Sequence, residues 1–256
     1  MIEKQYKAVF LDWDDTIGDW NRSARMAQHD LYEQFHLSEW FASYDDWYDA
    51  YHEHNTVLWD LYGHGLITKA FLKRDRCLYP VLHQLGFIEG EKEWRELLDK
   101  GQTMKAPQAL VDLADRMGKT FLKLTNRYFQ LLPEAEEVVK YLAAKYPLSI
   151  ISNGFQEVQH YKLEHSGLLP YITHILISEE VGINKPMPGI YQEALKRNGV
   201  GAEQAIMIGD SISSDISGAH AAGIDQIWIA PANTMAPTDM QPTFTVTKLT
   251  DIMSIL

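Results

Sequence analysis

Short apolar runs alternate with longer helix-like stretches through the second half of the chain. Four runs, at residues 148–151, 173–178, 205–209 and 226–230, have the length of buried strands. Amphipathic stretches of helical length separate them. Regular alternation of this kind predicts a sheet of parallel strands joined by helices.

One more apolar run, at residues 7–11, stands apart from these partners. The residues that follow it for more than a hundred positions show no strand pattern, and apolar residues such as Met26 and Leu31 recur there at three- and four-residue spacing. We therefore predict an α/β fold in which a Rossmann-like parallel sheet forms a core from residues 1–17 and 131–256. Residues 18–130 are predicted to form an inserted α-helical cap domain.

The overall charge narrows the choice of partners. The chain has 23 lysines and arginines against 35 aspartates and glutamates, a formal net charge of −12. This balance disfavours nucleic acid polymers and anionic membrane surfaces as partners. A small anionic substrate remains compatible with it, because salt screens charges beyond ~8 Å and a few local cations can outweigh a distant net charge.

Two features concern the compartment. Cys77 is the only cysteine, so no internal disulfide can form, which favours a reducing environment. Near the amino end a very short apolar run leads directly into acidic residues, so neither a secretory signal nor a membrane span is expected. We expect a cytoplasmic protein.

Four aspartates follow two of the predicted strands. Asp12 and Asp14 come after residues 7–11, while Asp210 and Asp215 come after residues 205–209. An ionised aspartate can attack phosphorus, and a second acid two residues further along an extended segment can protonate the leaving oxygen. Carboxylates also suit Mg²⁺. Acids after a strand can equally cap a turn. The aspartates therefore indicate a phosphoryl-transfer site only in combination with polar residues that follow other strands.

Those polar residues follow two other strands. Ser152, Asn153 and Gly154 lie between a strand and a helix, where a hydroxyl and backbone N–H groups can bind phosphate, or can simply cap the helix. Lys185 lies in a loop, where its charge can hold phosphoryl oxygens or be a solvated loop charge. We also expect Thr16 to hydrogen-bond the loop carrying Asp12, and we count it among the substrate-binding candidates.

The order of these motifs resembles the haloacid dehalogenase superfamily. The four matching pieces are D-x-D-x-T from Asp12, S-N-G from Ser152, K-P from Lys185 and G-D-x-x-x-x-D from Gly209. The helical stretch after the first motif resembles that superfamily's C1 cap. The segments NGFQEVQHYKLEHSGL and SEEVGINKPMPGIY are most similar to the branch of pyrimidine-nucleotide 5′-phosphatases.

The resemblance implies a role for each candidate residue. Asp12 would be the nucleophile, Asp14 the acid/base, and Ser152 and Lys185 the phosphate binders. The cofactor would be Mg²⁺, held by Asp12, the backbone carbonyl of Asp14 and Asp210. Asp215 would lie behind these ligands or orient Lys185.

Taken together, the motifs predict a Mg²⁺-dependent phosphatase that acts on small phosphate monoesters through an aspartyl-phosphate. The resemblance to the nucleotide-phosphatase branch implies a nucleoside 5′-monophosphate as the favoured substrate. Dehalogenation is disfavoured because the dehalogenases of the superfamily lack an acid at the position of Asp14. A sugar-phosphate phosphatase or phosphomutase keeps the same acids and stays open. So does a protein that only binds a phosphorylated metabolite.

One charged run in the expected cap has a plainer explanation. Lys73, Arg74, Asp75 and Arg76 alternate in sign along a predicted helix. Mixed charges of this kind are typical of a solvated helix face. We therefore expect a solvated helix face, with a cation aimed at the substrate as the alternative.

Overall fold

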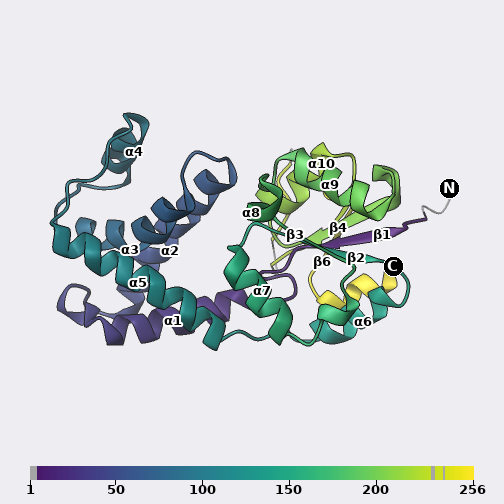
Figure 1. Ribbon diagram of the computed structural model, residues 1–256, viewed down its shortest axis with the longest axis horizontal. Helices are drawn as coiled ribbons and strands as arrows, with labels where there is room; N and C mark the ends of the chain where they lie inside the picture. Colours follow the sequence, from purple (N-terminus) through teal and green to yellow (C-terminus); the bar gives the residue numbers. More distant parts are fainter. Residues whose placement is uncertain (1–4, 232–233, 239) are drawn as a thin grey trace. The chain divides into compact units, whose positions relative to one another are not determined.

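The chain divides into two units. The computed structural model describes residues 5–231, 234–238 and 240–256. By internal contacts, Met1–Asn21 and Phe129–Leu256 form one unit, here called the sheet unit, and Arg22–Tyr128 forms the other, the helical unit. The helical unit thus interrupts the sheet unit in sequence, which Figure 1 traces by colour.

Among the described residues of the sheet unit, six strands form one parallel sheet. They run in the spatial order β3-β2-β1-β4-β5-β6. Their bounds are β1 (Ala8–Leu11), β2 (Leu148–Ser152), β3 (His174–Ile177), β4 (Ala205–Gly209), β5 (Asp225–Ile229) and β6 (Phe244–Val246). The parallel α/β sheet predicted from the sequence is confirmed. The sequence pattern missed β6, which is three residues long and has one buried residue.

Helices cover both faces of this sheet. They are α6 (Ala135–Ala143), α7 (Gln156–His165), α8 (Ser178–Val181), α9 (Pro188–Asn198) and α10 (Ser217–Ala221). The apolar side chains of α6 and α7 join one core cluster, and those of α9 and α10 join the cluster on the opposite face. Figure 1 shows α9 and α10 on one side of the strands and α6 on the other.

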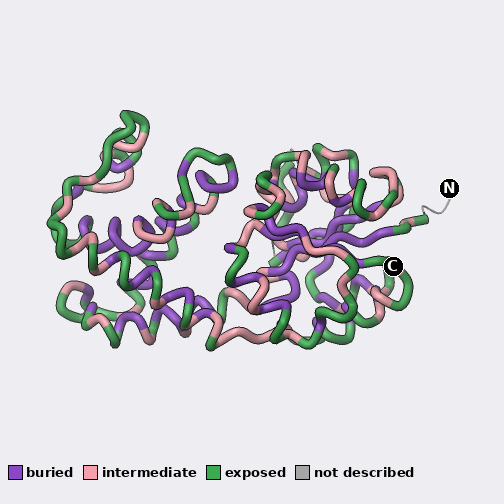
Figure 2. Tube along the Cα trace, viewed as in Figure 1, coloured by how far each residue is buried: buried purple, intermediate pink, exposed green. Residues whose placement is uncertain are grey.

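Alternate strand residues serve these two cores. In β1, Val9 and Leu11 belong to one cluster while Ala8 and Phe10 belong to the other, and all four are buried. Figure 2 shows the central strands as continuously buried. A strand buried on both faces has few polar positions, which explains why these strands appear in the sequence as mainly apolar runs.

The strand order fixes where a site can form. β1 lies in the middle of the sheet, with β2 on one side and β4 on the other. The chain winds outward from β1 to β3 and then returns to the far side of β1. In sheets of this kind, ligands bind at the carboxyl ends of the strands where the winding changes direction. Here that point lies between β1 and β4.

The helical unit is built around three long helices. The helices in or entering this region are α1 (Trp20–Gln34), α2 (Tyr44–Gly63), α3 (Lys69–Gln84), α4 (Glu91–Asp99) and α5 (Gln108–Arg127). Helix α3 contacts both α2 and α5. A Cβ at Gly118 of α5 would lie only 2.5 Å from the backbone oxygen of Lys73 of α3, so the close approach of these two helices requires a glycine there. Among the described residues, no helix combines the length and apolar character that crossing a bilayer requires.

The expected solvated face of the charged run in α3 was wrong for Asp75 and Arg76, and Lys73 and Arg74 are only partly exposed. Asp75 and Arg76 are buried, at 1% and 0% exposure. Because α3 packs against helices on two sides, it has little surface left for solvent. Asp75 Oδ2 accepts a hydrogen bond from Trp94 Nε1 at 2.8 Å and lies 3.3 Å from His54 Nε2. The Arg76 guanidinium lies over the Phe121 ring, 4.5 Å from its centroid.

We predict that Asp75→Ala destabilises the protein by at least ~2 kcal/mol, because it removes the acceptor for Trp94 inside a packed unit. The measurement is urea unfolding. The matched control is Asp49→Ala, which removes an exposed carboxylate from α2 and should change stability by less than ~0.5 kcal/mol. Equal unfolding curves for the two variants would contradict a structural role for Asp75.

Candidate active site

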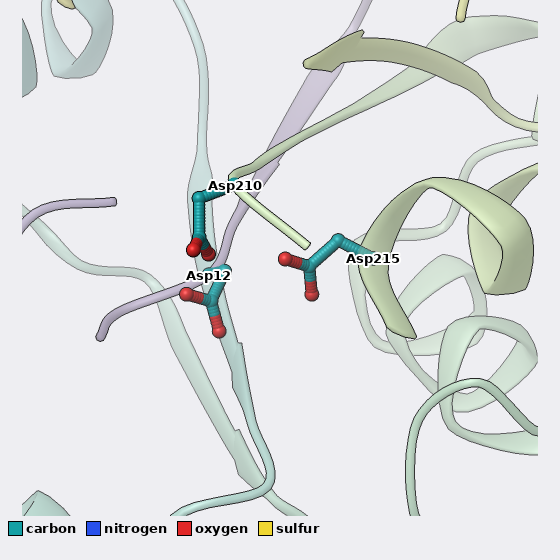
Figure 3. Close-up of side chains that lie close together, drawn as sticks. All are labelled: Asp12, Asp210 and Asp215. Atoms are coloured by element: carbon teal, nitrogen blue, oxygen red, sulfur yellow. The ribbon is translucent and has the colours of Figure 1, made fainter. Parts of the chain in front are cut away.

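Three aspartates meet at the carboxyl ends of β1 and β4. Asp12 directly follows β1, and its backbone N–H extends the ladder to Ile208 of β4 at 2.9 Å. Asp210 directly follows β4, and Asp215 lies in a π-helical turn, Ile212–Ile216. One carboxylate oxygen from each of Asp12, Asp210 and Asp215 lies within 4.8 Å of the others. Figure 3 shows the three side chains close together, with the Asp215 carboxylate directed toward the other two.

A buried lysine lies among these acids. Lys185 is 2% exposed, and its Nζ donates to Asp12 Oδ1 at 2.5 Å, to Asp215 Oδ1 at 2.7 Å and to the Ile151 carbonyl at 2.8 Å. All three donor positions of the ammonium group are therefore engaged. Asp215 also accepts the Ser211 N–H through Oδ2 at 3.1 Å. Asp215 therefore orients Lys185 from behind, one of the two positions that the motif resemblance implied.

The S-N-G segment helps to position Lys185 through the side chain of Asn153. Asn153 Oδ1 accepts the Lys185 N–H at 2.8 Å, and Asn153 Nδ2 donates to the Lys185 carbonyl at 2.8 Å. Both ends of this amide side chain thus bind the backbone of Lys185. Ser152 is buried, and its Oγ accepts the Gly154 N–H at 3.1 Å, which leaves its own hydroxyl proton available as a donor.

Asp14 lies in a different environment from Asp12. Its side chain is 26% exposed, and its Oδ1 and Oδ2 accept from Lys162 Nζ at 2.5 Å and Gln159 Nε2 at 2.7 Å. The carboxylate is therefore held by α7 and is not part of the three-aspartate cluster. A metal contact through the Asp14 backbone carbonyl, as the resemblance implies, stays a prediction.

Thr16 and the backbone around the first motif support the acids. The Thr16 side chain is fully buried, and its hydroxyl lies 3.5 Å from Asp210 Oδ1. Asp15 adopts a left-handed backbone conformation with φ of 60° and accepts the Asn21 N–H at 2.8 Å. Trp228 Nε1 donates to the Asp210 carbonyl at 2.8 Å. These contacts fix the turns that follow β1 and β4.

Burial raises the pKa values of two aspartates of the cluster, Asp12 and Asp210. For Asp12 burial is the largest cause, Lys185 opposes it, and the net effect raises the pKa to about 7. For Asp210, burial and the nearby charge of Asp12 raise the pKa to about 9. Burial alone would lower the pKa of Lys185, but Asp12 and Asp215 outweigh it and raise that pKa. The acids thus hold their protons unusually tightly unless another cation is present.

The donor set fits a hard divalent cation. Three carboxylates against one ammonium group leave two excess negative charges, and the carboxylate oxygens converge within 4.8 Å. Oxygen donors of this kind are what Mg²⁺ prefers, with water or substrate oxygens completing its shell. Asp12, Asp210 and, further back, Asp215 are the residues that could hold it.

Sequence reasoning missed two residues that contact the predicted site. Lys162 and Gln159 bind Asp14, yet both belong to a helix that follows the S-N-G segment. The available signal was their spacing, since residues three apart lie on the same helix face, the one that packs toward the sheet. A lysine on a helix is usually exposed, so the spacing alone gave no reason to select it.

Comparison with known proteins agrees with this geometry. The family model of haloacid dehalogenase-like hydrolases matches residues 6–223. A crystal structure of the HAD-hydrolase YfnB of Bacillus subtilis bound to magnesium covers 99% of both chains, with 25% sequence identity and a TM-score of 0.78.

Two curated relatives are enzymes that act on phosphorylated compounds. The phosphoserine phosphatase of Thermus thermophilus is 31% identical over 87% of this chain and 88% of its own length. Pyrimidine 5′-nucleotidase YjjG of Escherichia coli is 27% identical over 82% of each chain. The resemblance inferred from the motifs is thereby confirmed. The chain belongs to the haloacid dehalogenase-like hydrolases and is an enzyme of that family.

Proposed function

We propose that this hydrolase is a Mg²⁺-dependent phosphatase that cleaves small phosphate monoesters, with a nucleoside 5′-monophosphate as substrate. The observation that carries the proposal is the Asp12 carboxylate, held by Lys185 at 2.5 Å inside a cluster of acids suited to a cation. Asp14, two residues further on, supplies the second acid that phosphoryl transfer to and from an aspartate needs. The nucleotidase YjjG supports the substrate class.

The geometry suggests how the two acids divide the reaction. Lys185 binds Asp12 Oδ1, so Oδ2 attacks phosphorus and forms the aspartyl-phosphate while the ester P–O bond breaks. The leaving oxygen takes a proton from Asp14. Water then attacks the phosphorus, Asp14 takes up the water's proton, and the bond to Asp12 breaks to release phosphate. Bound Mg²⁺ would supply positive charge against the phosphoryl oxygens.

Ser152 at the end of β2 and Lys185 in the loop after α8 complete the proposed phosphate site. The Ser152 hydroxyl has its own proton available as a donor, and Lys185 places a positive charge beside the nucleophile. Preorganised donors of this kind stabilise the negative charge of the transferred group without reorganising during the reaction. Both side chains are held in place by buried contacts, which favours catalysis over simple ligand binding.

We predict that phosphate is released from nucleoside monophosphates with Mg²⁺ but not with EDTA, and that Asp12→Asn abolishes the release. An amide cannot replace the nucleophilic carboxylate, and no other residue of the motif set can form the intermediate. The measurement is phosphate release from a panel of nucleoside monophosphates, sugar phosphates and phosphoserine. No release from any compound would favour a phosphomutase or a phospho-ligand-binding protein, and full activity in Asp12→Asn would overturn the mechanism.

We predict that Asp14→Asn slows turnover by at least ~10²-fold, because it removes the proton donor and acceptor of the two steps. Mg²⁺ binding should persist, since the Asp14 side chain lies outside the cluster of Asp12, Asp210 and Asp215. Steady-state kinetics together with a Mg²⁺ titration checks both statements. Unchanged turnover would remove Asp14 from the chemistry.

The raised pKa values of Asp12 and Asp210 predict how Mg²⁺ and pH act together on stability. Each acid has a higher pKa in the folded chain than its ordinary value of 3.8, so the metal-free fold loses stability as pH rises from about 4 through about 9. A bound cation displaces these protons, so the affinity for Mg²⁺ increases as pH rises over the same range. The melting temperature should therefore rise more on adding Mg²⁺ at about pH 8.5 than at about pH 6.

Two variants test this linkage by thermal melting with Mg²⁺ and with EDTA. Asp210→Asn should lose most of the Mg²⁺-dependent rise, whereas Asp251→Asn, an exposed aspartate near the carboxyl end, should keep it. A rise that is independent of pH, or equally large in Asp210→Asn, would contradict a metal site at this cluster.

A further inference from the structure

Helix α7 binds both oxygens of the Asp14 carboxylate. Lys162 Nζ donates to Oδ1 at 2.5 Å and Gln159 Nε2 donates to Oδ2 at 2.7 Å. Neither residue belongs to the four motifs, although both lie within the segment NGFQEVQHYKLEHSGL. The two donors lie three residues apart, so they share one face of the helix and reach the carboxylate from the same side.

Several features show that this contact is built into the fold. Lys162 is 1% exposed, and a fully buried lysine is rare unless it is paired. Its ammonium group also lies over the Trp20 ring, 4.2 Å from the centroid, which further offsets the loss of water. A Cβ at Gly154 would lie 1.9 Å from Gln159 Nε2. The glycine of the S-N-G segment therefore leaves the space through which Gln159 reaches Asp14.

Contact at both oxygens fixes the plane of the carboxylate. A single donor would leave the group able to rotate about its bond to Cβ, whereas two donors at set positions on one helix define its orientation. An ionised carboxylate has about four lone-pair sites, so two remain open when Lys162 and Gln159 each occupy one. The open sites then have fixed directions, and one of them can carry the transferred proton.

We propose that Lys162 and Gln159 are positioning residues that aim Asp14 for proton transfer to the leaving group and from water. The inference rests on the proposed function, since it assumes that Asp14 transfers protons in phosphoryl transfer. Proton transfer needs close and correct geometry, so a carboxylate that can rotate away should be a poorer acid and base.

The test compares two substrates that differ in their need for an acid. The 4-nitrophenolate group leaves readily without a proton, whereas the alkoxide of benzyl phosphate needs one. We expect Lys162→Met to lower kcat/KM for benzyl phosphate by at least ~10-fold while changing kcat/KM for 4-nitrophenyl phosphate by less than ~3-fold. Gln159→Leu should act in the same direction. The ratio of the two values does not depend on how much of a preparation is folded.

Two further variants serve as controls. Asp14→Asn should show the same selectivity with a larger loss. Lys140→Met removes another lysine–carboxylate pair of the sheet unit, the exposed one with Glu136 at 2.5 Å, and should leave both kcat/KM values unchanged. Equal losses on the two substrates, or no loss, in both Lys162→Met and Gln159→Leu would overturn the positioning role. Absence of phosphate release by the unmodified enzyme from every phosphate ester tested would instead overturn the proposed function.

Discussion

The ammonium group of Lys185 joins the turns at the carboxyl end of the sheet. It bonds to Asp12 after β1, to the Ile151 carbonyl in β2 and to Asp215 in the turn beyond β4. Without it, neighbouring carboxylates about 4 Å apart would repel each other by ~4 kcal/mol per pair at an effective dielectric of about 20. One ammonium group offsets only one of the three carboxylate charges. The arrangement that links these turns therefore also favours the binding of a divalent cation.

The residues around this lysine are selected by space and hydrogen bonding as much as by chemistry. Asn153 binds the Lys185 backbone through both ends of its amide. A Cβ at Gly209 would lie 2.3 Å from Asp215 Oδ2, so a glycine is needed where the aspartate folds back on the strand end. Gly154 leaves equivalent space for Gln159. Asn153, Gly154 and Gly209 therefore help to determine where Lys185 and the surrounding carboxylates lie.

The sequence predicted the sheet and the meeting of Asp12, Lys185, Asp210 and Asp215 because these features follow local rules: apolar runs form buried strands, and parallel strands bring their carboxyl ends to one edge. It missed features that depend on packing. Lys162 is an ordinary helical lysine until the space beside Gly154 and the ring of Trp20 bury it. Asp75 and Arg76 looked solvated because charge alternation along one helix does not reveal that two other helices cover it. The short edge strand β6 carries too few buried residues to show a pattern.

Asp12 and Asp14 are only two positions apart in the sequence, yet each pairs with a different buried lysine. Asp12 pairs with Lys185, which follows β3, and Asp14 pairs with Lys162, which comes from α7. Breaking a buried ion pair is costly because it leaves the remaining charge without its partner. Loss of Lys185 would leave both Asp12 and Asp215 without their cation, whereas loss of Lys162 removes the cation of Asp14 and leaves the ion pairs of Asp12 and Asp215 intact. In the proposed mechanism, the orientation of Asp14 therefore depends on a different buried ion pair from the one that holds Asp12.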